Sequence, residues 1–178
     1  MLFSSRQMAH HLQGIKLKID GHQILPTQGA RNLGVTMDSN ACMEKQINKI
    51  CRAAYGQLKA INRISHFLDR RTLEIVIHAF VTSRVDFCNS ILVGVKQSLL
   101  AKIQRVQNAA ARILTKTPRR THIHVTSILR TLHWLPVAAR VEYKVLVLVF
   151  KCLDKTAPSY LCDLITPYDP SRPLYWSR

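Results

Sequence analysis

The first third of the chain alternates between apolar and polar positions with the period of a β-strand. Residues 15–19 alternate strictly between apolar residues and lysine, which predicts a half-buried strand. Asp20-Gly21 is a hairpin turn signal, and residues 22–25 would form the returning strand. A third short strand is predicted over residues 31–37, where Gly34 indicates a bulge or a close backbone approach. The amino-terminal part therefore predicts a small antiparallel β element.

The period changes to that of a helix after Asp38-Ser39-Asn40, three residues of types that commonly cap helices. A long helix is predicted over residues 41–64. In a helical projection one side is apolar and holds Met43, Ile47, Ile50, Ala54, Leu58 and Ile61. The opposite side holds Lys45, Lys49, Arg52, Lys59 and Arg63. One side of this helix is expected in the core, and the other forms a row of positive charge.

Further helical segments follow. A second helix is predicted from Asp69 or Thr72 to residue 85, and a third from Ser98 to residue 117, stopped by Pro118. The third helix has an apolar seam of Leu99, Ile103, Val106, Ala110 and Ile113, with Arg105, Arg112, Lys116 and Arg119 on the far side. Shorter helical pieces are expected over 126–133 and 158–164, and a long helix with a thick apolar face over 137–153. The predicted fold class is mainly α, with helices arranged as in a bundle.

Charge narrows the range of partners. The chain has 178 residues, of which 47% are hydrophobic, enough for a packed core. Its formal net charge is +16, which attracts nucleic acid first and an anionic membrane surface second. Between residues 96 and 120 there are seven basic residues and no acidic one. The alternative interpretation is a basic protein whose charge serves only solubility.

The sequence gives little support for a metal site or for a membrane-spanning segment. The five cysteines are odd in number and lack C-x-x-C spacing, so we expect buried, reduced thiols in an intracellular protein, nuclear or cytoplasmic. His122 and His124 alternate, but a metal role for them is not favoured. The apolar run at 145–150 is far shorter than the roughly 20 residues of a spanning helix. Residues 1–14 lack a secretory signal pattern. No metal or other cofactor and no membrane partner are predicted.

Two blocks of sequence are more specific. The first is Arg31-Asn32-Leu33-Gly34-Val35-Thr36-Met37-Asp38, followed by the basic helix. The second is Leu132-His133-Trp134-Leu135-Pro136-Val137 with Arg140 and Tyr143-Lys144, continuing into Ala157-Pro158-Ser159-Tyr160-Leu161. Together they resemble the region after the active site of LINE-type (non-long-terminal-repeat) retrotransposon reverse transcriptases. The resemblance extends over residues 1–173.

The resemblance implies an organisation and a role. Residues 1–38 would be a residual palm-like β segment, 39–120 a thumb-like helical region, and 121–166 a carboxy-terminal helical segment. Residues 167–178, rich in proline, would be a disordered tail. A thumb holds the template–primer duplex by its backbone, which requires basic helix faces.

The departures from this family argue against catalysis. Polymerisation needs metal ions held by clustered carboxylates, and this chain has no Asp-Asp pair and only ten dispersed acidic residues. The fingers, most of the palm and the endonuclease are expected to lie outside a chain cut at both ends. No P-loop, G-x-S-x-G or H-E-x-x-H motif occurs. We expect no catalytic residue, and we expect Trp134 to pack at the Leu-Pro corner.

Three hypotheses remain. The first is a non-catalytic reverse transcriptase remnant that contacts RNA or DNA, duplex or hybrid, without reading sequence. Its binding residues would be Lys45, Lys49, Arg52, Lys59, Arg63, Arg105, Arg112, Lys116 and Arg119. The second is a helical interaction or structural module, and the third is an open reading frame without selected function. Self-association is also expected, because the β element and the apolar run at 145–150 lack obvious partners.

Overall fold

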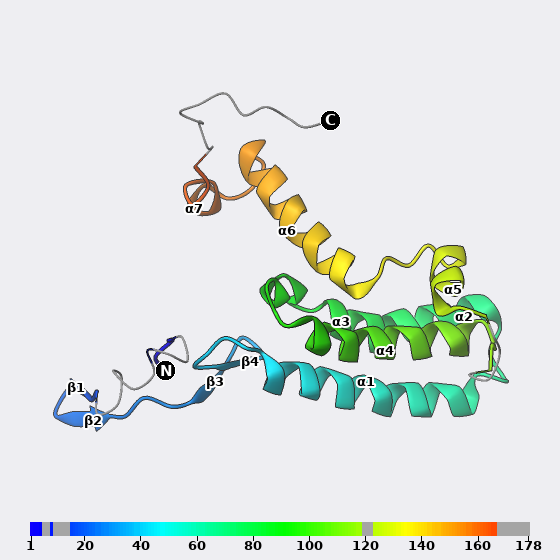
Figure 1. Ribbon diagram of the computed structural model, residues 1–178, viewed down its shortest axis with the longest axis horizontal. Helices are drawn as coiled ribbons and strands as arrows, with labels where there is room; N and C mark the ends of the chain where they lie inside the picture. The colour runs from blue at the N-terminus through cyan, green and yellow to red at the C-terminus, as the bar shows by residue number, and fades with distance from the viewer. Residues whose placement is uncertain (5–7, 9–14, 119–122, 167–178) are drawn as a thin grey trace.

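The protein is mainly helical with a small antiparallel β element at its amino-terminal end, as the sequence predicted (Figure 1). The β element consists of two hairpins. The computed structural model describes residues 1–4, 8, 15–118 and 123–166. The strands are β1 (Leu17–Ile19), β2 (His22–Ile24), β3 (Gly29–Asn32) and β4 (Val35–Asp38). The helices are α1 (Glu44–Ile64), α2 (Arg70–Ile77), α3 (Ser83–Asp86), α4 (Gln97–Leu114), α5 (Val125–Thr131), α6 (Val137–Leu153) and α7 (Ser159–Cys162). The predicted tail, 167–178, lies outside the described residues.

The prediction of one strand over residues 31–37 is wrong, because this segment is the turn of a second hairpin. β3 pairs with β4, and Asn32 stands opposite Val35. Leu33 and Gly34 form the two-residue loop, with φ values of 46° and 87°. Positive φ at both positions is the geometry of a type I′ turn, whose twist matches that of the flanking strands. Gly34 is therefore a turn residue and not a bulge. Leucine at the first loop position conceals the turn signal.

The two hairpins differ in how they meet the helices. β1 and β2 pair around the predicted Asp20-Gly21 turn. The prediction of a half-buried strand is wrong, because Leu17, Ile19 and Ile24 are all exposed and no helix in the described part of the chain covers this hairpin. β4 packs against α1 and contributes buried Val35 to the core. Figure 1 shows β1 and β2 standing away from the helical body, while β3 and β4 lie at the start of α1. Only the second hairpin is part of the packed structure.

α1 begins without the expected side-chain cap. Its N-cap position is Met43, in the left-handed region with φ 59°, and the helix starts at Glu44 instead of near residue 41. The Asp38 carboxylate instead accepts hydrogen bonds from the backbone N–H of Cys42 at 2.7 Å and from its Sγ at 3.1 Å. Burial acts to raise the pKa of Asp38, but these hydrogen bonds outweigh it and lower that pKa. Asp38 thus holds the loop before the helix.

The second helical region is continuous but changes its period. Asp69 caps α2 as predicted, accepting hydrogen bonds from the backbone N–H groups of Arg71 and Thr72. A π-helical turn, His78–Thr82, joins α2 to α3. A 3₁₀ turn, Asn89–Leu92, then leads towards α4. The predicted cap at Ser98 is wrong, because α4 begins at Gln97 and its N-cap residue, Lys96, makes no side-chain cap bond.

The core lies between α1, α2, α3 and α4 and extends to α5 and the start of α6. The predicted apolar side of α1 is buried throughout, and so is the seam of α4 except for half-buried Ile113. Ile47, Leu73, Ile77 and Ile103 are among the side chains that are fully buried. Periodicity therefore identified the correct core-facing sides of both long helices.

The Leu-Pro corner joins α5 to α6 and is held by α4. Gln107 Nε2 donates to the Leu135 carbonyl at 2.8 Å, and Gln104 Oε1 accepts from the backbone N–H of Val137 at 2.8 Å. Trp134 is half-buried, and its ring lies against that of His78, with a centroid distance of 5.3 Å. The prediction that Trp134 packs at this corner is confirmed.

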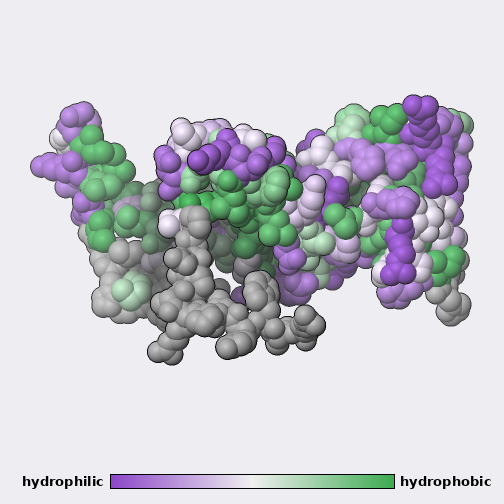
Figure 2. Space-filling model, turned by 90° about the horizontal axis from the view of Figure 1, so that it is seen from above, coloured by the Kyte–Doolittle hydropathy of each residue, from purple (hydrophilic) through white to green (hydrophobic). Residues whose placement is uncertain are grey.

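α6 leaves one of its sides uncovered. Val137, Val141 and Cys152 are buried, and Arg140 pairs with Asp86 on α3 at 2.9 Å. The opposite side exposes apolar Tyr143, Leu146, Phe150 and Leu153 at 57–66%. Figure 2 views the molecule from the side of α6 and shows an apolar patch at its carboxy-terminal half. Within the described residues, no helix is both long and apolar enough to cross a membrane.

Candidate nucleic-acid interface

The five predicted basic residues of α1 are all exposed, and they follow the outer edge of this helix. Lys45, Lys49 and Arg52 lie together in the first half, around an open cavity of about 440 Å³ that Asn48 also lines. Lys59 and Arg63 lie in the second half. None of the five forms an ion pair within the part of the chain that the structure describes. This row is available to an anionic partner.

α4 runs parallel to α1 and lies beside it (Figure 1). Near the start of both helices, Lys102 Nζ donates to Asn48 Oδ1 at 3.0 Å and lies 3.6 Å from Glu44 Oε1. Near their ends, His66 after α1 and Lys116 after α4 line the same cavity. The parallel helices therefore share one surface, which two cavities hollow in its second half, and we call this surface the α1–α4 groove.

The two walls of the α1–α4 groove carry positive charge. The α4 wall contributes Lys102, Arg105, Arg112 and Lys116, and the α1 wall contributes Lys59. Burial raises the pKa of the half-buried Cys51 thiol on α1, although the nearby charges of Lys102 and Arg105 oppose this shift. Glu44, at one end, is the acidic residue of α1, and α4 has none. The groove concentrates cations from two segments distant in sequence.

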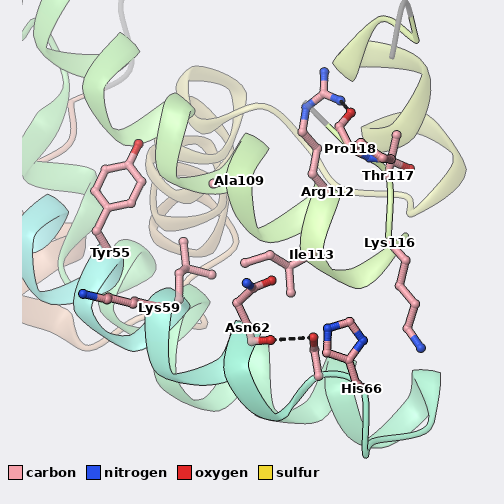
Figure 3. Close-up of a pocket in the computed structure, with 12 residues that line it drawn as sticks. Tyr55, Lys59, Asn62, His66, Ala109, Arg112, Ile113, Lys116, Thr117 and Pro118 are labelled. Carbon is pink, nitrogen blue, oxygen red and sulfur yellow. Dashed lines mark hydrogen bonds between the residues drawn. The ribbon is translucent and has the colours of Figure 1, made fainter. Parts of the chain in front are cut away.

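Arg112 has a different role from the one predicted. Its Nη1 donates to the Pro118 carbonyl at 3.2 Å, and its Nη2 donates to the Ile123 carbonyl at 3.4 Å. Figure 3 shows its side chain directed towards Pro118. The Arg112 guanidinium thus holds the loop after α4 against that helix. Part of its hydrogen-bonding capacity is already used by these loop carbonyls. Arg119, also predicted to bind, lies outside the described residues.

The other predicted cations of α4 remain free for a ligand. Arg105 is exposed and lines a cavity of about 370 Å³ with Tyr55, Asn108 and Arg112. Lys116 is exposed and follows the last turn of α4 in the left-handed conformation, with φ 52°. Neither forms an ion pair in the ranges that the structure describes. Both are therefore better candidates for phosphate contact than Arg112.

Sequence reasoning missed four residues of this site: Tyr55, Asn62, His66 and Lys102. Tyr55 is 39% exposed and lines both cavities of the groove. In a helical projection Tyr55, Asn62 and Lys102 fall between the apolar and the basic sides, and His66 lies beyond the end of α1, so neither pattern selects them. The signal that identifies them is the pairing of α1 with α4, which exists only in three dimensions.

Metal and thiol chemistry add no second site. Among the described residues, no three His, Cys, Asp or Glu side chains gather closely enough to hold a metal ion. His124 is the N-cap of α5, where its Nδ1 accepts from the Thr126 N–H at 3.4 Å, and His122 lies outside the described residues. The expectation of buried cysteines is met by Cys152 alone, since Cys42, Cys51 and Cys162 are half-buried. Cys88 is exposed because it lies in the turn after α3.

Comparisons with protein-family models, with curated proteins and with solved structures give no match to this chain. The geometry of the α1–α4 groove is therefore the basis on which a function is assigned.

Proposed function

We propose that the chain binds the backbone of RNA or DNA without reading its sequence, through the α1–α4 groove and the outer edge of α1. The observation that carries this proposal is the row of cations from two parallel helices, with Glu44 as the acidic residue among them. Lysine and arginine side chains on a helix face contact phosphates, which gives affinity but no sequence information. The proposed setting is intracellular, nuclear or cytoplasmic, and the proposed ancestry is the thumb region of a LINE-type reverse transcriptase.

The proposal includes the absence of catalysis. The sequence has no Asp-Asp pair, and polymerisation needs a carboxylate cluster that holds two metal ions. Purified chain should therefore not extend a primer on a template, with magnesium or with manganese. Extension that persists after controls for contaminating polymerase would contradict this part of the proposal.

A salt titration of duplex binding tests the groove. The variant combines Lys59→Gln, Arg105→Gln and Lys116→Gln, which leaves the structural Arg112 in place. Removal of one cation that binds a phosphate should reduce the slope of log affinity against log salt by roughly 0.9, so the slope should fall by about two to three. Helix content should hardly change, because glutamine is nearly as good a helix former as lysine or arginine.

A matched control separates the groove from total charge. Lys16→Gln, Lys18→Gln and Lys155→Gln also remove three positive charges, but from the first hairpin and the end of α6. The control variant should keep the wild-type slope to within about half a unit. Equal slopes for the two variants would mean that the groove is an ordinary solvated surface. A third variant, with Lys45, Lys49 and Arg52 changed to Gln, measures the contribution of the outer edge of α1.

The exposed side of α6 favours a second candidate function, a helical protein-interaction module. Four apolar side chains on a single helix side form a surface of the kind that packs against another helix. Binding through this surface would depend little on salt, whereas phosphate binding falls steeply with it. Association with another protein that persists at high salt, is lost in Leu146→Gln with Phe150→Gln and is kept by the groove variant would favour this second function.

A further inference from the structure

The second half of the α1–α4 groove deepens into a cavity of about 530 Å³ (Figure 3). Its floor is apolar and is formed by Leu58, Ala109 and Ile113. Its rim is polar and cationic, formed by Tyr55, Lys59, Asn62, His66, Arg112 and Lys116. Figure 3 shows Tyr55 and Lys59 at one end of the cavity, Ile113 next to Asn62 in its middle, and Lys116 at the other end. The cavity combines an aromatic wall, an apolar base and positive charge.

A site that bound only phosphate would not require the aromatic wall and the apolar floor. Phosphate contacts along a duplex require only exposed cations, such as those on the outer edge of α1. An apolar floor beside an aromatic ring is instead suited to the face of a nucleobase, since base–aromatic stacking tolerates every base. The volume lies within the roughly 300–1,000 Å³ range of sites for small organic ligands, which is enough for a single nucleotide. A base held in a duplex has both faces covered and cannot enter.

We propose that this cavity accepts one unpaired nucleotide of a bound strand, with its base against Tyr55 and the neighbouring apolar floor and its phosphate near Lys59. This inference rests on the proposed function, because the backbone contacts bring the strand to the groove. It adds a preference that backbone binding alone does not contain: single strands, overhangs and bulges are favoured over uninterrupted duplex of equal length.

The test separates base contacts from phosphate contacts with two probes of equal length. One is a twelve-residue oligothymidylate, and the other is an abasic strand with the same sugar-phosphate backbone. The wild-type chain should bind the oligothymidylate about tenfold more tightly, because one stacked base contributes roughly five- to 150-fold. The dependence on salt should be the same for both probes, since both present the same phosphates.

Two variant pairs locate the effect. Tyr55→Leu should lose the tenfold preference and keep the wild-type affinity for the abasic strand, whereas Tyr55→Phe should keep both. Ala109→Leu should fill the floor and abolish the preference, whereas Ala101→Leu, on an exposed position of α4 away from the groove, should leave it unchanged. Affinity for the abasic strand reports whether each variant is folded.

The outcomes distinguish this inference from the function on which it rests. Equal, salt-dependent wild-type affinity for both probes would overturn the nucleotide site and leave backbone binding intact. A preference that survives in both Tyr55→Leu and Ala109→Leu would also overturn it. Failure to bind either probe, or the duplex, at low salt would remove the proposed function and this inference together.

Discussion

At the scale of single residues, three helices end on side chains in a conformation that usually belongs to glycine. Lys116, His133 and Lys155 have φ values of 52°, 55° and 56° and follow α4, α5 and α6. After α4, Lys116 N–H bonds to Ile113 O and Thr117 N–H bonds to Arg112 O. The same pair of bonds closes α5 and α6, and it defines the Schellman motif. Lysine at this position is strained, but its charge interacts favourably with the helix dipole.

Glycine substitutions at two of these positions separate stability from binding. Lys116→Gly and Lys155→Gly should each stabilise the fold by about 0.5 kcal/mol, because relief of the left-handed strain exceeds the lost dipole interaction and the added chain entropy. Urea unfolding measures this gain. Only Lys116→Gly should also reduce the salt slope of duplex binding, by roughly 0.9. A Lys155→Gly variant with the same reduction in slope would indicate a pure charge effect.

Two aspartates respond to pH in opposite directions. Hydrogen bonds from Thr72 and Arg71 lower the pKa of Asp69, so its contribution to stability is present above about pH 3.8 and disappears as pH falls through the folded-state pKa. Asp69→Asn keeps the cap but does not titrate. The wild-type urea midpoint should therefore fall more than that of this variant between pH 5 and pH 2.5. If the urea midpoints of the wild type and the variant fall equally, Asp69 is not the group that makes stability depend on pH in this range.

Asp86 should give folding stability the opposite dependence on pH. Burial raises its pKa, and the charges of Arg140, Lys144 and His78 oppose the shift without cancelling it. The proton is therefore held more tightly in the folded chain, and stability associated with this group is lost as pH rises from about 3.8 through the raised pKa. Asp86→Asn should remove that loss, and comparison of its urea midpoints at pH 3.5 and pH 6 with those of the wild type measures it. An unchanged difference between the two pH values would place the titrating group elsewhere.

At the scale of elements, the link between α4 and the Leu-Pro corner is a pair of glutamines and not a hydrophobic contact alone. Gln107 is 5% exposed, donates to the Leu135 carbonyl, and accepts from Gln104 Nε2 at 2.8 Å. Gln107→Leu removes both bonds and should destabilise the chain by about 1–3 kcal/mol. Gln97→Leu, on an exposed position of the same helix, should change stability by less than about 0.5 kcal/mol. If the two variants lose equal stability in urea unfolding, the Gln107 hydrogen bonds do not hold the corner to α4.

At the scale of the whole molecule, two apolar surfaces lack partners among the described residues: the exposed side of α6 and the hairpin of β1 and β2. Exposed apolar patches and unpaired strand edges favour association, so the isolated chain should form oligomers or aggregates at micromolar concentration. Leu146→Gln with Phe150→Gln should shift the mass measured by light scattering towards the monomer. Leu17→Thr with Ile24→Thr tests the hairpin separately. A wild-type chain that is monodisperse and monomeric would contradict the expectation.

Much of the element structure was predictable because it depends on neighbours in sequence. Periods of two and of 3.6 residues located the first hairpin, the long helices and their buried sides. The errors are local details that periodicity does not encode. The Leu33-Gly34 turn lacks the usual residue at its first position, and Asp38 binds Cys42 instead of capping α1.

The sequence by itself determined which sides of α1 and α4 are buried and which are basic, because both follow from spacing along one helix. Only the tertiary structure decided that α1 and α4 lie parallel, as the bond between Asn48 and Lys102 across 54 residues illustrates. That arrangement places Lys59 and Lys116 on the lining of one cavity, adds Tyr55 to the site and commits Arg112 to the loop carbonyls. These outcomes depend on contacts between distant segments, whose relative placement is set by the packing of the shared core.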